Sequence, residues 1–552
     1  METEKRNKKS IILLLLLAAA PVLSGLTLWA VSGANPLHMD MWKTAWNDEV
    51  VYYRAVRLMR IHGLPQGVAG YNEVAPPQLS YGPYNIFTFI PYWLLSFVTG
   101  TDGHNYFCHA NLILACAGTL LLAAFARPER RKAGWMILLF MTNLILARYT
   151  WSGMIETSYN FFLIVFTGLT LWIIHQGAGK PGRTAAMICL MILMVFFWSV
   201  MRPFYAALLL IPLCLSWKRG TGMGPVARCL LSLGAAAAGG AALKLYMYFG
   251  SHSVVKYFAD AVSPTARLRE LIGSRSLSLI LQTVLSANLE GLREVKRYLL
   301  EANWIGAVTL LFYISWLLLL VLWIRSISRR ENDGRVSAAF GMLLSGALIY
   351  EATIVLYSPI QLHRMLLAVT VACGILIIDL SDGRTLPFIQ ELAILGLMTF
   401  LVINRPSSYV VPQMDPTSIT GTAQETEQAE LAALLPLSED PWDNTIAKEA
   451  EGENLEYAFL APSWTAFNIC QYDVLEEKLR TGTLQSRYVL LAEDSDLKKL
   501  CDSLCGEEKL PSAKDAGGKT GLGKAGTVEN ASKAVKLEQI WEKYGHVLYK
   551  VK

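Results

Sequence analysis

The chain has 552 residues, of which 53% are hydrophobic and only 17% are charged, and its formal net charge is +5. A soluble protein of this size carries about 25% charged residues, so the composition excludes an ordinary soluble enzyme. The basic residues stand in short clusters between apolar runs. That is the positive-inside pattern of a membrane protein, and it argues against a nucleic-acid-binding face.

Apolar runs of roughly 15 to 23 residues recur through the first 410 residues, a length that matches the hydrocarbon core of a bilayer. The runs are rich in Leu, Ile, Ala and Phe and show no two-residue alternation, which favours helices over a barrel. We therefore expect an all-α polytopic membrane protein with about eleven transmembrane helices. The predicted spans are 11–32, 106–126, 135–147, 159–176, 184–200, 203–217, 226–248, 303–324, 336–357, 364–379 and 387–403.

The first apolar run, from Ile11 to about Val31, follows a basic N-terminus. It is longer than the core of a signal peptide, which has about 7 to 15 residues. We interpret it as a retained first span.

A shorter apolar stretch, 84–99, contains Pro91, and its status determines the orientation of everything after it. If this stretch does not cross the membrane, the strongly basic connectors lie on the same side as the N-terminus. That arrangement agrees with the positive-inside rule, which places Lys and Arg on the cytoplasmic side. We therefore expect a re-entrant or interfacial helix here, a cytoplasmic N-terminus and an external C-terminus in a plasma membrane. The connectors hold Arg127, Arg130, Arg131, Lys132, Lys180, Arg183, Lys218, Arg219, Arg325, Arg329, Arg330 and Arg335.

This topology divides the chain into a transmembrane domain, 1–403, and an extracytoplasmic domain, 404–552. The transmembrane domain has external loops at 33–105 and 250–302. The C-terminal domain alternates strand-like and helical patterns, which predicts a small α/β unit. Its predicted strands are 457–460, 488–492 and 547–551, its predicted helices are 474–479 and 497–504, and its flexible insertion is 511–535.

The first external loop holds an acidic pair, Asp48 and Glu49, at the predicted start of a helix that ends at Gly63. Asn47 or Asp48 suits the N-cap, and glycine suits the C-terminal end. Asp48 and Tyr52 share one face of this helix. Spacing alone also allows a plain structural role, in which the two carboxylates interact with the helix dipole.

The string Asp48-Glu49-x-x-Tyr52-x-x-x-x-Arg57-x-Met59-x-x-x-Gly63 resembles the acidic loop of GT-C membrane glycosyltransferases. That superfamily includes protein O-mannosyltransferases and lipid A aminoarabinose transferases. The resemblance covers roughly residues 10–410. It continues in three further motifs: Tyr71-Asn72-Glu73 with Tyr81-Gly82-Pro83-Tyr84, then Trp198 to Arg202-Pro203, then Gln361-Leu362-His363-Arg364-Met365. The chain departs from the family in having Tyr-Gly-Pro for a proline pair and Met365 for a tyrosine.

The resemblance implies transfer of a sugar from a polyprenyl-phosphate or polyprenyl-pyrophosphate donor to an external glycan, lipid or protein. It assigns Asp48 as the general base, with Glu49 in support and Asp40 as the fallback base. Cationic side chains or a divalent cation, Mg²⁺ or Mn²⁺, would meet the charge on the leaving phosphate. The expected donor-binding residues are Arg364, His363, Arg202, Tyr52, Arg57, Glu73, Tyr81 and Glu351.

Ionisable residues near the predicted external ends of the spans are further evidence for a site at the external face. Intramembrane charges are costly and usually face a cavity or one another. Glu351 stands about 9 Å inside its boundary at helical rise, too deep for simple snorkelling to the interface. The residues at this level are Arg148, Glu156, Arg202, Lys244, Glu351 and Arg364.

Two other classes of protein remain open. A transporter or flippase would also line a cavity with buried charges, although it would need access from both faces, and the sequence shows no comparable cluster at the cytoplasmic ends. A non-catalytic membrane scaffold would use its tail to recruit partners.

Overall fold

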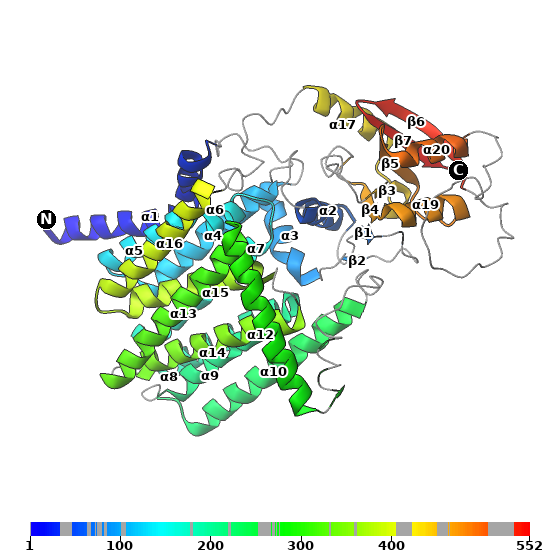
Figure 1. Cartoon of the computed structure of the whole chain (residues 1–552). Helices are drawn as coiled ribbons and strands as arrows, with labels where there is room; N and C mark the ends of the chain where they lie inside the picture. Colours follow the sequence, from blue (N-terminus) through cyan, green and yellow to red (C-terminus); the bar gives the residue numbers. More distant parts are fainter. Residues whose placement is uncertain are drawn as a thin grey trace.

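The computed structural model describes most of the chain, and Figure 1 shows a helical body with a smaller sheet-containing unit beside it. The described residues are 2–33, 47–62, 68–71, 73, 80–81, 86–100, 106–176, 180–218, 222–251, 267, 271, 273–274, 276–330, 333–357, 361–404, 422–449, 462, 464–505 and 535–552. The predicted fold class, a polytopic helical protein with a small α/β unit, is confirmed.

Nine helices of the described chain are long and apolar enough to cross a membrane, and each matches a predicted span. They are α1 (Glu2–Ser32), α4 (Tyr106–Ala126), α7 (Glu156–Gln176), α8 (Pro181–Met201), α10 (Pro225–Ser251), α13 (Trp304–Ser328), α14 (Asp333–Leu356), α15 (Leu362–Leu380) and α16 (Thr385–Asn404). Long apolar runs therefore form the elements that their length predicts, and α1 does so although it contains Pro21.

The other two predicted spans are broken or short. The run 135–147 falls in α5 (Arg130–Thr142) and α6 (Leu144–Thr150), which meet at 71°. Between them the Asn143 side chain accepts a hydrogen bond from the Leu146 backbone N–H at 3.1 Å, which starts a new helix. The run 203–217 becomes a 3₁₀ helix, η1 (Pro203–Leu209), followed by the short α9 (Leu210–Trp217).

The short apolar stretch 84–99, which we predicted not to cross the membrane, forms α3 (Ile86–Thr99), a helix of 14 residues. At helical rise it is about 21 Å long, shorter than the roughly 30 Å hydrocarbon core. It packs against α4, α8 and α2 (Asn47–His62). Its length fits a re-entrant or interfacial helix, and the sidedness of the chain stays a prediction.

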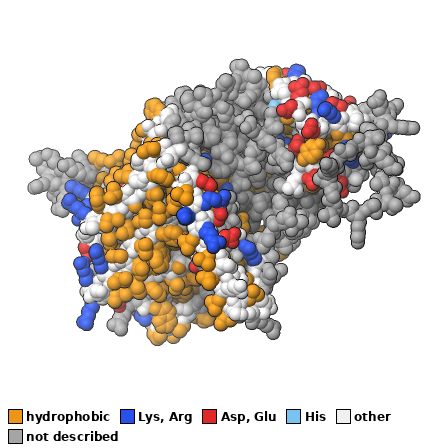
Figure 2. Space-filling view, in the orientation of Figure 1, with side chains coloured by type: hydrophobic (Ala, Val, Ile, Leu, Met, Phe, Trp, Pro, Cys, Tyr) orange, Lys and Arg blue, Asp and Glu red, His pale blue; other side chains and the backbone are white. Residues whose placement is uncertain are grey.

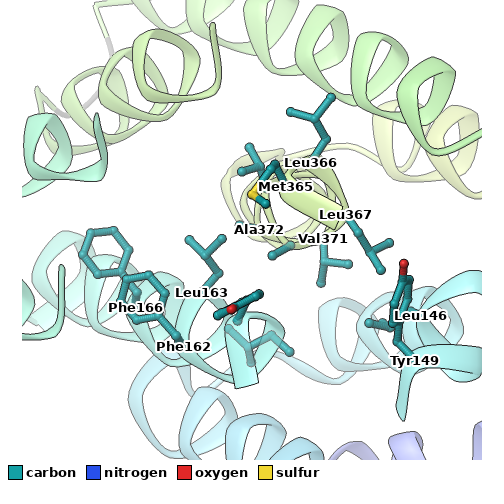
Figure 3. Packing of buried hydrophobic residues seen from close by; sticks show 14 of the residues in the cluster. Leu146, Tyr149, Phe162, Leu163, Phe166, Met365, Leu366, Leu367, Val371 and Ala372 are labelled. Carbon is teal, nitrogen blue, oxygen red and sulfur yellow. The ribbon is translucent and has the colours of Figure 1, made fainter. Parts of the chain in front are cut away.

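The centre of the helical body is formed by α15 and α7. In their apolar windows 94% of α15 and 89% of α7 are buried inside the protein. Figure 3 shows Met365, Leu367 and Val371 of α15 between Phe162 of α7 and Tyr149 of α6. Both helices are thus held firmly, and their first turns carry Arg364 and Glu156.

A long helix from the second predicted external loop, α12 (Leu277–Leu300), packs on α13 and α14. It is amphipathic: Gly291, Val295 and Tyr298 are buried, whereas a row of leucines that includes Leu281 and Leu285 is exposed. Gly291 permits the close packing, because a Cβ there would lie 2.7 Å from Ile354 of α14.

The sheet has seven strands in the order β2-β1-β4-β3-β5-β7-β6 among the described residues. The first five in that order are parallel, and β7 and β6 are antiparallel to their neighbours. Two strands, β1 (Val68–Tyr71) and β2 (Ser80–Tyr81), come from the first predicted external loop. The tail supplies β3 (Thr445–Glu449), β4 (Ala466–Cys470), β5 (Tyr488–Ala492), β6 (Leu537–Lys543) and β7 (His546–Val551).

The predicted strands 488–492 and 547–551 are present as β5 and β7. The predicted helices lie within α19 (Tyr472–Thr481) and α20 (Asp496–Cys505), and the tail also contains α17 (Thr422–Leu434) and η6 (Pro441–Asn444). The strands β3, β4 and β6 were not predicted. The predicted strand 457–460 and the insertion 511–535, except its last residue, lie outside the described residues.

Candidate functional site

The acidic loop-one helix, α2, lies between the helical body and the tail sheet, as Figure 1 shows. It begins and ends within one residue of the predicted bounds. Tyr52 and Tyr53 are fully buried, and the Tyr52 ring lies 6.0 Å from Phe89 of α3 and 6.4 Å from Phe107 of α4. This aromatic packing fixes the helix on the body. Tyr52, which we expected to bind the donor, is therefore part of the helix's anchor.

Glu49, the second member of the acidic pair, is fully buried. Its Oε1 accepts a hydrogen bond at 2.7 Å from the backbone N–H of Gly153, in the segment 151–155 between α6 and α7. The carboxylate thus joins the start of α2 to this segment. Asp48 lies in the first turn of α2, and its side chain, like all of Asp40, lies outside the described part of the structure. Arg57, two turns further along α2, is half-buried.

The segment 151–155 is held in place by Asn111 of α4. The Asn111 side-chain amide donates to the carbonyls of Ser152 at 2.6 Å and Met154 at 2.9 Å. Its oxygen accepts from the Tyr92 hydroxyl of α3 at 2.8 Å. All of these groups are buried, so a single asparagine links α3, α4 and the segment that Glu49 contacts.

Directly after this segment, Glu156 forms a buried ion pair with Arg364. The Arg364 Nε lies 3.2 Å from the Glu156 Oε1, and the side chains are 12% and 2% exposed. The hydroxyl of Tyr149, at the end of α6, lies within electrostatic reach of both partners and of Arg148. The first turns of α7 and α15 are therefore joined by charge beside the loop-one helix.

Two more basic side chains gather at the same level. The Arg148 guanidinium lies 5.3 Å from the centre of the Trp304 ring, which in turn meets the His363 ring edge-on at 4.2 Å. His363 is buried, at the start of α15. The structure thus places His363 and Arg148 next to Arg364, at the ends of α6, α13 and α15.

Arg202 joins this group through Tyr159. The Arg202 Nε donates to the Tyr159 hydroxyl at 3.2 Å, and Tyr159 lies on α7 one turn after Glu156. Glu156 and Arg364 also act electrostatically on the Tyr159 hydroxyl. Tyr149, Tyr159 and Asn111 were not predicted, because no motif distinguishes them from ordinary residues of apolar helices.

The Oε2 of Glu351 accepts a hydrogen bond from the Asn288 amide of α12 at 2.8 Å. It helps to join α12 to α14, where Tyr350 and Tyr313 also share a hydrogen bond at 2.5 Å. The described hydrogen bond of Glu351 therefore joins it to α12 and not to the arginine group.

Glu73, also expected to bind the donor, is fully buried against the tail. Its carboxylate accepts from the Asn468 amide at 2.7 Å, from the Ser486 backbone N–H at 3.2 Å and from the Ser486 hydroxyl. These contacts, together with a bond from the Gln485 N–H, engage both oxygens. Glu73 thus fastens the first loop to the tail. The Tyr81 side chain, on β2, lies outside the described residues.

An apolar cavity of about 380 Å³ lies between α8, η1, α10 and α14. Ser199 and Pro203, on either side of Arg202, contribute to its wall. The other lining residues are Phe204, Ala206, Ala207, Gly239, Leu243, Leu348, Ala352 and Leu356. Within the described residues, no group of three His, Cys, Asp or Glu side chains is placed to hold a metal ion.

These features define a multi-pass helical membrane protein in which an acidic loop-one helix, a group of arginines and a tail domain meet. No protein-family model and no curated protein matches the sequence. Two solved structures are similar to the chain. The oligosaccharyltransferase of Archaeoglobus fulgidus, solved with a tethered acceptor peptide, has a TM-score of 0.46 and 12% identity over 90% of this chain and 70% of its own. ArnT from Cupriavidus metallidurans in the apo state has a TM-score of 0.47 and 11% identity over 96% of each chain.

Proposed function

We propose that the protein is a membrane glycosyltransferase of the GT-C kind. It transfers a sugar from a polyprenyl-phosphate or polyprenyl-pyrophosphate donor to an acceptor at the external face, which is a cell-envelope glycan, a lipid or a protein. One observation carries the proposal. The buried Glu49 holds the acidic start of α2 against the segment that leads directly into the Glu156–Arg364 pair.

The chemistry follows from that juxtaposition. Asp48 accepts the proton of an acceptor hydroxyl as the acceptor oxygen bonds to the anomeric carbon of the sugar. The bond between that carbon and the phosphate oxygen breaks, and the lipid phosphate leaves with the electron pair. Arg364 and Arg202 stabilise the phosphate charge, because fixed cations in a dry site act far more strongly than in water. The planar guanidinium group of Arg364 can donate two parallel hydrogen bonds to phosphate oxygens.

Glu49, Tyr52 and Asn111 take positioning roles. The buried hydrogen bond of Glu49 sets the start of α2, and the buried Tyr52 ring anchors its middle. The apolar cavity beside Arg202 suits isoprenyl units of the donor, since its walls offer hydrocarbon contacts next to a cation for the phosphate. His363 and Arg57 remain proposed donor contacts.

Transport is the alternative that a structural observation brings forward. The sequence shows no cluster at the predicted cytoplasmic ends comparable to the external one, but packing brings three ionisable side chains together at that end. Asp379, which is buried at the end of α15, lies 2.5 Å from His175 of α7 and 3.7 Å from Lys132 of α5. Between Arg364 and Asp379, however, α15 is almost fully buried in apolar packing (Figure 3). Because apolar packing surrounds α15 between its two charged ends, this helix supports an enzyme that acts at one face of the membrane over a transporter.

The test uses purified full-length protein with radiolabelled polyprenyl-linked sugars and measures the loss of label from the lipid. Wild-type protein should release label, and Asp48→Asn should abolish release while keeping the wild-type melting temperature. Asp443→Asn, an exposed tail carboxylate, is the matched control and should behave as wild type. Normal turnover by Asp48→Asn, or its loss only in Asp40→Asn, would sink the assignment of the base. Flux of the intact donor across proteoliposomes without label release would favour transport.

A further inference from the structure

At the end of the helical body that carries the basic connectors, a second cavity lies between α13 and the turn from α15 to α16. Its volume is about 310 Å³. Arg325 and Arg329, from the last turns of α13, line one side, and the turn 380–386 lines the other. Figure 2 shows Lys and Arg side chains bordering the apolar surface at the end of the body away from the tail. The predicted topology places this end in the cytoplasm.

A buried hydroxyl in the wall points to a ligand. Ser381 is 4% exposed, lines the cavity, and its Oγ has no hydrogen-bond partner among the described residues. An unsatisfied buried hydroxyl is costly, and a bound oxygen would satisfy it. Serine hydroxyls and arginines are common partners of phosphate oxygens.

The backbone of the same turn adds a second source of positive potential. Asp382, Gly383 and Arg384 lead into α16, a helix of 20 residues that begins at Thr385. The first N–H groups of a helix have no partner within the helix, and they favour an anion at that end. The cavity therefore joins two guanidinium groups, a free hydroxyl and a helix N-terminus.

One carboxylate, that of Asp382, also lines the cavity, but it is already paired. Its Oδ1 lies 3.1 Å from the Arg335 Nη1, and its backbone carbonyl accepts from Arg131 at 3.0 Å. Arg325 and Arg329 form no ion pair among the described residues. The cavity is thus positive overall.

The surroundings favour a lipid over a soluble anion. Leu322, Leu380 and Leu386 make part of the cavity wall apolar. Exposed apolar side chains then continue along both helices away from the cavity, with Val321 and Ile324 on α13 and Phe388 and Leu392 on α16. A phosphate in the cavity would have acyl chains lying along these two faces.

We propose that this cavity binds the phosphate headgroup of an anionic phospholipid of the cytoplasmic leaflet. Arg325, Arg329 and Ser381 contact the phosphate oxygens, and the leucines contact the glycerol and the first acyl carbons. The site is separate from the proposed catalytic region, which lies at the opposite ends of α13 and α15.

The experiment is native mass spectrometry of the full-length protein in detergent, titrated with phosphatidylglycerol or with phosphatidylcholine. Wild-type protein should retain phosphatidylglycerol preferentially. The double variant Arg325→Gln/Arg329→Gln should weaken that binding at least about tenfold, since it removes both guanidinium groups that line the cavity. Ser381→Ala should weaken it about fivefold, the effect of one hydrogen bond.

The matched control is Arg330→Gln, which removes the same charge from the same connector at an exposed residue outside the cavity. It should bind as wild type. Equal loss in Arg330→Gln, or unchanged binding in the double variant, overturns the site. Competition by free glycerol phosphate at concentrations comparable to the lipid overturns the lipid as ligand and identifies a soluble phosphate compound instead. The variants' melting temperatures check that each remains folded.

Discussion

Glu73 and Asn468, which lie 395 residues apart in the sequence, exchange two hydrogen bonds. The Asn468 amide donates to the Glu73 carboxylate at 2.7 Å, and the Glu73 backbone N–H donates to the Asn468 side-chain oxygen at 3.3 Å. Next to this pair, β1 of the first loop extends the tail sheet through β4. The first loop, 33–105, and the tail are therefore joined through this sheet. Because α2 leads into β1, the tail also restrains the loop-one helix.

We expect Glu73→Ala to release β1 from the tail. The substitution removes the acceptor of the Gln485 N–H, of the Ser486 N–H and hydroxyl, and of the Asn468 amide, which costs about 2–4 kcal/mol. Hydrogen exchange should show loss of protection in 68–71 and at Gln485 and Ser486. Glu493→Ala, at an exposed position of the same domain, is the control and should leave protection unchanged. Full protection in Glu73→Ala would contradict the role of this residue.

Variants of the Glu156–Arg364 pair distinguish an effect on protein stability from an effect on sugar transfer. Glu156→Gln alone leaves a largely buried arginine without its counter-charge, and such changes cost about 3–5 kcal/mol. The double variant Glu156→Gln/Arg364→Gln removes both charges and should regain more than half of that loss, measured as the melting temperature in micelles. Sugar transfer should stay low in the double variant, because the Arg364 guanidinium, one of the two that we propose to stabilise the leaving phosphate, is absent. Recovered transfer would remove Arg364 from the donor site.

The sequence predicted well the helices whose bounds depend on capping residues or on the length of an apolar run. The bounds of α2 followed from Asn47 and Gly63, and nine spans followed from their apolar length. The broken run 135–147 was missed because Asn143 acts as a cap within an apolar stretch. A single polar residue there does not show whether it ends a helix or faces a neighbour.

Contacts between distant segments could not be predicted in the same way. The motif around Glu73 indicated a donor contact, yet its partners come from the tail, and β1 is too short to show a strand pattern. Arg364 and Glu156 were both expected at one level, since each opens a span. Their pairing, and the cluster of Asp379, His175 and Lys132, depends on how the helices pack.

Asn111 offers a test of positioning at a distance from the reacting atoms. Asn111→Ala removes three buried hydrogen bonds to Tyr92, Ser152 and Met154, and should destabilise the protein by about 2–4 kcal/mol. Because the freed segment carries the Glu49 contact, transfer should fall further than the folded fraction does. Tyr92→Phe removes only one of the three bonds and should cost about 1 kcal/mol with nearly normal transfer. Equal effects of the two variants would argue against a role for the segment 151–155.

The last prediction concerns pH and the docking of α17 on the sheet. Glu430 accepts hydrogen bonds from the Trp541 indole at 3.0 Å and from Lys543 at 3.0 Å. The hydrogen bond from Trp541, and then that from Lys543, lowers the pKa of Glu430 from its ordinary value of 4.5. A carboxyl group whose pKa is lower in the folded state stabilises the fold above its ordinary pKa, and this contribution is lost as the pH falls through the lowered value. The contact of α17 with β6 should therefore weaken only below about pH 4.5, near the ordinary carboxyl pKa.

The measurement follows the indole N–H resonance of Trp541, which is assigned by its absence in Trp541→Phe. In wild-type protein this resonance should shift in that pH range. The control Glu439→Gln, which changes an exposed carboxylate in the segment after α17, should show the same shift. In Glu430→Gln the shift should disappear, and its persistence there would assign the titration to another group.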